Sequence, residues 1–291
     1  MGAQPSFDQN RVRRYYDRHT SGFLALGTGG TQGVIHRAVW GPGVTSPADA
    51  FHYVDDRIAE AIAAMQPAVI GTGGFTSLPS LHIVDLGCGV GATLCHLARR
   101  LDARATGVTL SPVQARLATA RIEAERLADR VTCLEGSFDA LPRSIPPADA
   151  AYAIESFAHA PDPAAFFAEA ARLVRPGGLL LVCDDVRRRG GGAAARRTIR
   201  RFTRGWHLNT LLTSGEIVAL AQATGFEHRD TMNLSSYLVP LSRRDRLLDA
   251  TLGWLPLGAT PLGPVLGGAA LQKCLARGWT AYELLTFQRR A

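Results

Sequence analysis

The chain has 291 residues, of which 46% are hydrophobic and 20% are charged. This length is enough for about two average domains or one enlarged α/β domain, and the composition excludes intrinsic disorder, collagen and coiled coil. The net charge of +7 is concentrated, because eight arginines lie between Arg187 and Arg204 while no acidic residue occurs from Arg187 until Glu216. The five cysteines form no C-x-x-C pair and the first residues hold no apolar signal-like core, so we expect a cytoplasmic protein without structural zinc.

Residues 1–75 are predicted to form an N-terminal helical cap. The segment VDDRIAEAIAAM, at residues 54–65, has the apolar spacing of an amphipathic helix. The Gly/Ser/Thr-rich residues 71–80 that follow are typical of a linker. A second domain is therefore predicted over residues 76–291.

In this second domain, strand-like and helix-like segments alternate. Such alternation predicts a doubly wound α/β fold, in which helices cover both faces of a mostly parallel sheet. The expected strands are 82–86, 105–110, 131–135, 150–154, 179–183 and 282–288, and the clearest helices are 111–127 and 163–174.

A run without charged residues, 250–272, is long enough by count to cross a bilayer. Pro256, Pro261 and Pro264 interrupt it, and each proline inside a helix removes a backbone donor, so we expect no transmembrane segment. The alternatives are an apolar lid, a loop that touches a membrane surface, or a buried connection. We expect substrate-binding insertions around 187–215 and 235–278.

The sharpest local motif is IVDLGCGVGA, at residues 83–92. A buried strand brings Asp85 to its carboxyl end, and Gly87, Gly89 and Gly91 then allow a tight turn that a nucleotide can approach closely. The spacing is G-x-G-x-G, whereas dinucleotide-binding enzymes have G-x-G-x-x-G.

In this form the segment resembles the first motif of class I S-adenosylmethionine-dependent methyltransferases. Three further segments match in the expected order: ATGVTLSPVQ at 105–114, EGSFDALP at 135–142 and VRPGG at 174–178. The resemblance implies a Rossmann-like, seven-stranded sheet and S-adenosylmethionine as cofactor. The family commonly has acids where Thr109 and Ser137 stand here. The cofactor-binding residues that it implies are Asp85, Gly87, Gly89, Gly91, Thr109, Leu110, Gln114, Ser137 and Phe138.

Two other segments resemble sterol C-methyltransferases and related isoprenoid C-methyltransferases. These are YAIESFAHAPDP at residues 152–163 and the N-terminal segment 15–43, which begins YYDRHTSGF. This resemblance implies methyl transfer to an alkene carbon, with Tyr16 near the methionyl part of the cofactor.

Methylation of an alkene leaves a carbocation, which must be stabilised and then deprotonated. Glu155 follows the fourth strand, where ligands of open parallel sheets bind, and it is the predicted base; His159 is its predicted partner or an alternative base. Aromatic faces stabilise cations, and the candidates for substrate contact are Trp40, Tyr152, Phe157 and Trp206.

A cationic stripe follows if the arginine-rich segment is helical, because its arginines recur at three- and four-residue spacing. Guanidinium groups bind phosphate oxygens in bidentate geometry, so the stripe favours a linear prenyl diphosphate such as geranyl or farnesyl diphosphate, with Mg²⁺ sharing the charge. The substrate-binding candidates in this stripe are Arg196, Arg197, Arg200, Arg201 and Arg204.

Alternative functions are a methyltransferase for a sterol-like or other neutral lipid, one for oxygen or nitrogen of a small natural product, and an RNA-binding methyltransferase. We expect a small-molecule isoprenoid partner and no nucleic acid. Peripheral membrane contact and a homo-oligomer stay open.

Overall fold

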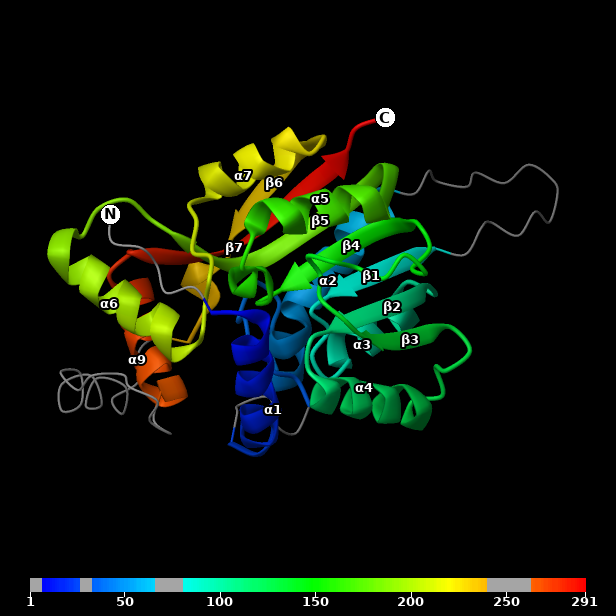
Figure 1. The fold of residues 1–291 in the computed structure, drawn as a ribbon, viewed down its shortest axis with the longest axis horizontal. Helices are drawn as coiled ribbons and strands as arrows, with labels where there is room; N and C mark the ends of the chain where they lie inside the picture. Colours follow the sequence, from blue (N-terminus) through cyan, green and yellow to red (C-terminus); the bar gives the residue numbers. More distant parts are fainter. Residues whose placement is uncertain (1–6, 27–32, 66–80, 240–262) are drawn as a thin grey trace.

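The computed structural model describes residues 7–26, 33–65, 81–239 and 263–291, and these form one seven-stranded sheet with helices on both faces (Figure 1). The strand order is β3-β2-β1-β4-β5-β7-β6. The first five strands are parallel, whereas β7 runs antiparallel between β5 and β6. The strands are β1 His82–Leu86, β2 Arg104–Thr109, β3 Val131–Glu135, β4 Ala148–Ile154, β5 Val174–Arg187, β6 Phe226–Asn233 and β7 Thr280–Arg289.

Two apolar cores separate the helices into layers. On one face, Ile58, Leu94 and Ile122 of α2, α3 and α4 pack with odd-numbered residues of β5 such as Leu181. On the other face, side chains of α5 and α7 pack against the even-numbered ones, such as Leu180. The helices are α1 Gln9–Leu26, α2 Pro47–Met65, α3 Ala92–Arg100, α4 Pro112–Ala124, α5 Pro163–Leu173, α6 Gly192–Gly205, α7 Ser214–Ala223 and α9 Gly263–Ala276.

These elements confirm the predicted doubly wound α/β fold, including all six expected strands to within a few residues. The largest difference in length is β5, which continues from 174 to 187 because it pairs with β7 along residues 179–187. The sequence analysis missed β6, an edge strand in which only Phe226 is buried. The predicted linker at 71–80 lies outside the described residues, and the division at residue 75 stays a prediction.

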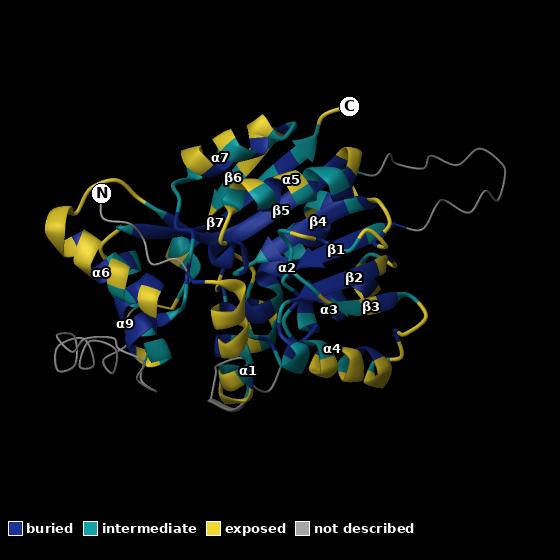
Figure 2. Cartoon of the chain, viewed as in Figure 1, coloured by how far each residue is buried: buried dark blue, intermediate teal, exposed yellow. Residues whose placement is uncertain are grey.

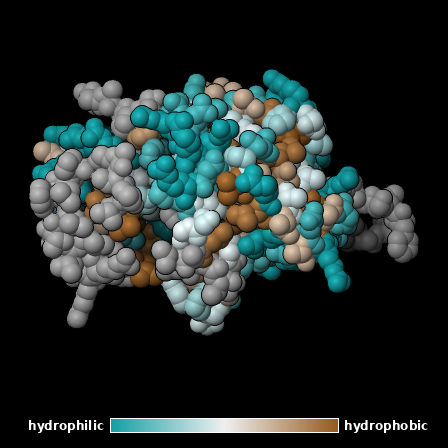
Figure 3. All heavy atoms as spheres, turned by 60° about the horizontal axis from the view of Figure 1, so that its bottom comes forward, coloured by the Kyte–Doolittle hydropathy of each residue, from teal (hydrophilic) through white to brown (hydrophobic). Residues whose placement is uncertain are grey.

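None of the helices that the structure describes is long and apolar enough to cross a membrane. Within the uncharged run, residues from 263 onward belong to α9, and the earlier part lies outside the described ranges. On the face drawn in Figure 3, hydrophobic residues reach the surface in several places.

Helices α6 and α9 cross at a close approach between two glycines. A Cβ atom on Gly205 would lie 2.6 Å from Cα of Gly267, and one on Gly267 would lie 2.7 Å from Cδ1 of Trp206. The Nε1 atom of Trp206 also donates a 3.0 Å hydrogen bond to the carbonyl of Pro264. The glycines therefore set the distance between these helices and the position of the indole ring.

We expect Gly267→Ala and the neighbouring substitution Gly268→Ala to have opposite effects on stability. Overpacking at residue 267 should lower the free energy of unfolding by about 1–3 kcal/mol. A Cβ atom at residue 268 meets only ordinary contacts at 3.7 Å, so the gain in helix propensity should raise that free energy by about 0.5–1 kcal/mol. Urea unfolding of both variants tests this pair, and equal shifts of either sign would contradict it.

Candidate active site

A pocket of about 300 Å³ lies at the carboxyl ends of β1, β2, β4 and β5, and α1 forms one of its walls. Open parallel sheets bind ligands at this edge, where the chain crosses from strand to helix. The wall from α1 includes Val12, Tyr15 and Tyr16.

The glycine turn after β1 forms the floor of the pocket. Gly87 has a φ of +111°, and a Cβ atom there would lie 2.4 Å from Cβ of Ser156, whose hydroxyl donates to the carbonyl of Leu86 at 2.6 Å. Gly91 packs in the same way against Ala118 of α4. Only glycine allows both the backbone conformation and this close packing, which leaves the turn open toward the pocket.

The residues predicted to bind the cofactor line this pocket together, Gly91 alone excepted. Buried Thr109 donates to Oε1 of Gln114 at 2.8 Å, and Nε2 of Gln114 reaches Thr20 of α1 at 3.2 Å. Burial, followed by the charge of Asp55, raises the pKa of Asp85 well above its usual value.

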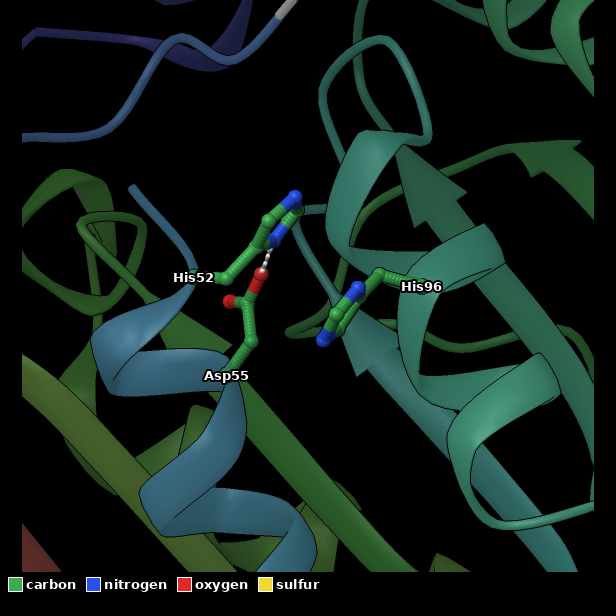
Figure 4. A group of neighbouring side chains, drawn as sticks. All are labelled: His52, Asp55 and His96. Carbon is green, nitrogen blue, oxygen red and sulfur yellow. Dashed lines mark hydrogen bonds and ion pairs between the residues drawn. The ribbon is translucent and has the colours of Figure 1, made fainter. Parts of the chain in front are cut away.

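Asp55 of α2 joins several segments beside the pocket through its carboxylate. Its buried carboxylate accepts a hydrogen bond from His52 at 2.9 Å (Figure 4). It also accepts one from Thr93 at 3.1 Å, and His36 lies 3.7 Å away. The ligand atoms of His52, Asp55 and His96 lie within 4.8 Å of one another. The two histidine rings are stacked at 3.9 Å and nearly parallel, however, so their in-plane lone pairs do not converge on one metal position.

Arg37 follows His36 in the chain and lies between two carboxylates that line the pocket. Its Nε donates to Oε1 of Glu155 at 3.0 Å, and Nη1 and Nη2 donate to the two oxygens of Asp185 at 3.1 and 3.0 Å. Burial raises the pKa of Glu155, but the charge and hydrogen bonds of Arg37 outweigh it and hold that pKa below its usual value. Burial and the charge of Asp185 raise the pKa of the neighbouring Asp184 to about 7.

Glu155 has an unusual backbone as well as an unusual environment. Its φ of +49° lies in the left-handed region, which non-glycine residues adopt mainly where the surroundings impose it and which often occurs at functional sites. Three donors reach Oε1 of Glu155, namely the amide and Nε of Arg37 and the hydroxyl of Tyr282. Among the described residues, Oε2 accepts no hydrogen bond, and this oxygen is left for a ligand.

His159 forms a second polar group on the pocket wall. Its Nδ1 lies 3.2 Å from the carbonyl of His207 and so carries the proton, which leaves Nε2 to accept a 2.6 Å hydrogen bond from Tyr16. Burial lowers the pKa of His159 to about 4. The imidazole is therefore neutral at pH 7 and can accept a proton from a sufficiently acidic group.

The depressed pKa of His159 predicts that acid weakens the fold. Between pH 6.5 and pH 4 the unfolded chain binds this proton more tightly than the folded chain, so the stabilising contribution of the neutral ring is lost as the pH falls through this window. At pH 5 the loss should be about 2 kcal/mol. Urea unfolding at pH 7 and pH 5 should show a smaller drop for His159→Gln than for the unmodified chain, and an equal drop would contradict the assignment.

Several predicted substrate contacts do not line the pocket. Tyr152 and Phe157 are buried in the core, and Trp40 is 40% exposed outside the pocket, whereas Trp206 does line it. The predicted arginine stripe does form a helix, α6, but the apolar face of α6 packs on α9 and its outer face is exposed (Figure 2). None of Arg196, Arg197, Arg200, Arg201 and Arg204 lines the pocket that the described residues form.

The sequence analysis missed Arg37, Asp55 and the α1 wall residue Val12, whereas it did predict Tyr16 of the same wall. The partners of Arg37 lie 118 and 148 residues further along the chain, so no local spacing marks it. The run IHRAVW at residues 35–40 lies in the N-terminal segment that resembles sterol C-methyltransferases, and the arginine of this run was the available signal.

Comparisons with known proteins agree with this geometry. Residues 84–182 match a family model described as a methyltransferase domain. The chain is 28% identical to the O-methyltransferase rstn1 of Aspergillus nomiae, over 81% of this chain and 99% of that protein. Among solved structures it is similar to the [4+2]-cyclase SpnF, with a TM-score of 0.70, 25% identity and coverage of 99% and 97% of the two chains. Geranyl diphosphate C-methyltransferase from Streptomyces coelicolor shares the fold at 19% identity, with a TM-score of 0.68 and coverage of 98% and 99%.

Proposed function

Because the chain is a class I S-adenosylmethionine-dependent methyltransferase, we propose that it methylates an olefinic carbon of an isoprenoid acceptor. S-adenosylmethionine supplies an electrophilic methyl group. Gly87, Gly89 and the hydrogen-bonded pair Thr109 and Gln114 would hold the nucleoside of the cofactor. Tyr16 would lie near its methionyl part.

The observation that carries the proposal is the position of Glu155, whose Oε2 has no hydrogen-bond partner among the described residues at the wall of a largely apolar pocket. The π bond of the acceptor would form a C–C bond to the methyl group while the C–S bond of the cofactor breaks with its electron pair left on sulfur, and the neighbouring acceptor carbon would become positive. Glu155 and Asp185 carry two negative charges against the single positive charge of Arg37, so the site stabilises a cation. A carbon next to the positive centre would then lose a proton to Glu155 or to neutral His159, and the electron pair of that C–H bond would form a new double bond.

The pocket favours the neutral hydrocarbon part of an isoprenoid over its diphosphate. Arg37 is the arginine that lines this pocket among the described residues, and both of its partners are carboxylates. Mg²⁺ does not fit this site either, because the guanidinium of Arg37 already lies between Glu155 and Asp185, while both oxygens of Asp184 accept backbone hydrogen bonds.

A second candidate is methylation of oxygen. It is favoured by neutral His159, which lines the pocket and could accept the proton of a hydroxyl group at Nε2 when that group takes the place of the hydroxyl of Tyr16. The long similarity to an O-methyltransferase also supports it.

Incubation with ¹³C-methyl-labelled S-adenosylmethionine tests these two candidates. The panel would contain geraniol, farnesol and a sterol, each alkene beside its saturated analogue, together with the diphosphates in the presence and absence of Mg²⁺. We expect label on carbon for the alkenes and no product from the saturated analogues. A methyl group found on the hydroxyl oxygen of both forms would establish the second candidate in place of the first.

A further inference from the structure

A second cleft lies beside the end of β5, outside the pocket described above. It is lined by the run Arg187–Arg189, by the first residues of α7, and by Thr280 and Ala281 at the start of β7. The backbone fixes this arginine run in place, because the amide of Arg187 donates to Leu212 at 2.7 Å and that of Arg188 donates to Trp279 at 2.9 Å.

The charges in the cleft are mostly positive. Arg187 pairs with Glu216 at 3.1 Å, and Arg188 pairs with buried Glu283, which also accepts a hydrogen bond from Ser214. Arg189 is exposed and makes no ion pair or hydrogen bond with the part of the chain that the structure describes. Three arginines against two glutamates leave one positive charge, on a guanidinium that is free to bind.

The start of α7 adds backbone donors to the same cleft. Thr213 caps the helix together with Glu216, and the first helical residues, Ser214 and Gly215, line the cleft. The amides of a first helical turn have no partner inside the helix, and they bind anions readily.

Thr280 supplies an independent indication of a ligand. The residue is 2% exposed and lines the cleft, and its hydroxyl has no hydrogen-bond partner among the described residues. A buried hydroxyl without a partner costs about 1–3 kcal/mol, and a ligand in the cleft would supply the missing partner.

We propose that this cleft binds a phosphate or diphosphate group through Arg189, the amides of Ser214 and Gly215, and the hydroxyl of Thr280. Guanidinium groups, helix N-termini and hydroxyl donors are the groups that bind phosphate oxygens in proteins. The phosphate belongs either to a separate phosphorylated compound or to the end of the methyl acceptor. The site is distinct from the arginine stripe of α6, whose members do not line it.

Calorimetric titration of the full chain with sodium pyrophosphate, at constant ionic strength, tests the proposal. We expect saturable binding, which Arg189→Gln weakens about tenfold and Thr280→Val weakens about threefold or more. Arg116→Gln is the matched control, because Arg116 is an exposed arginine of α4 outside both clefts, and it should change the affinity less than about twofold. Absence of saturable binding, or equal weakening by Arg116→Gln and Arg189→Gln, would overturn the proposal.

Thr280→Val also separates a binding role from a structural one. Since the hydroxyl has no partner, its replacement by a methyl group should leave the melting temperature unchanged or raise it while pyrophosphate affinity falls. A fall in melting temperature without a loss of affinity would show that the hydroxyl belongs to the core.

Competition identifies the source of the phosphate independently of the methylation chemistry. If pyrophosphate competes with a prenyl diphosphate acceptor, and Arg189→Gln raises the KM of that acceptor but not of its alcohol, the cleft holds the end of the acceptor. Saturable pyrophosphate binding without competition assigns the cleft to a separate phosphorylated compound. Both results support the proposed site, and both can be obtained whichever atom of the acceptor is methylated.

Discussion

Replacement of Arg37 by methionine should lower the free energy of unfolding by about 3–5 kcal/mol and abolish methyl transfer. The substitution keeps much of the side-chain volume but removes the guanidinium that lies between Glu155 and Asp185, which are 16% and 3% exposed. Two buried carboxylates would then lack a counter-charge, and the pKa of Glu155, which Arg37 holds low, would rise. Urea unfolding at pH 7 measures the loss.

Two controls test whether the loss of stability comes from leaving buried carboxylates without a counter-charge. Arg229→Met removes the partner of Glu227 in a pair with side-chain exposures of 50% and 51%, and it should cost less than about 1 kcal/mol. Adding Glu155→Gln and Asp185→Asn to Arg37→Met removes the unbalanced charges and should restore at least half of the lost stability. If the triple variant is less stable than Arg37→Met alone, charge imbalance is not the cause.

Glu155→Gln should reduce kcat at least about 100-fold while the Kd for S-adenosylmethionine stays within about threefold. Glutamine has the same size and its oxygen can still accept the hydrogen bonds from Arg37 and Tyr282. What it loses is the negative charge and the ability to accept a proton, which the carbocation requires of Glu155, whereas in methylation of oxygen His159 accepts the proton. Single-turnover rates and calorimetric cofactor binding measure the two quantities separately.

Glu169→Gln is the matched control for this second prediction, since Glu169 is a carboxylate on α5 that does not line the pocket. It should change kcat less than twofold. Retention of most of the rate by Glu155→Gln, combined with its loss in His159→Gln, would assign the proton to the histidine and favour methylation of oxygen.

The sheet could be predicted from the sequence because its strands are short apolar runs that alternate with helices. The glycine turn could also be predicted, because its glycines stand at a fixed spacing in the sequence. In the structure, close contacts with Ser156 and Ala118 require glycine at residues 87 and 91. The edge strand β6 was invisible for the opposite reason: in FEHRDTMN only the first residue is buried, so no apolar period marks it.

The candidate site was predicted in part. Glu155 and His159 were found from a family motif, and both reach the pocket. Arg37 was not found, because its importance comes from carboxylates on β5 and after β4 that only folding brings to it. The arginines of α6 attracted a ligand assignment through their spacing, but the same spacing results from an amphipathic helix whose apolar side packs on α9.

Helix α1 is joined to three separate segments around the pocket. Gln9 donates to Asp139 at 2.9 Å, Asp17 accepts from Ser111 at 2.5 Å, and Tyr16 donates to His159 at 2.6 Å. Because one helix makes all of these bonds, moving it away from the pocket breaks them together. We therefore expect the pocket to open in a single cooperative step. We expect spent cofactor to leave through such a step, so turnover should slow when solvent viscosity rises, even with a fast chemical reaction.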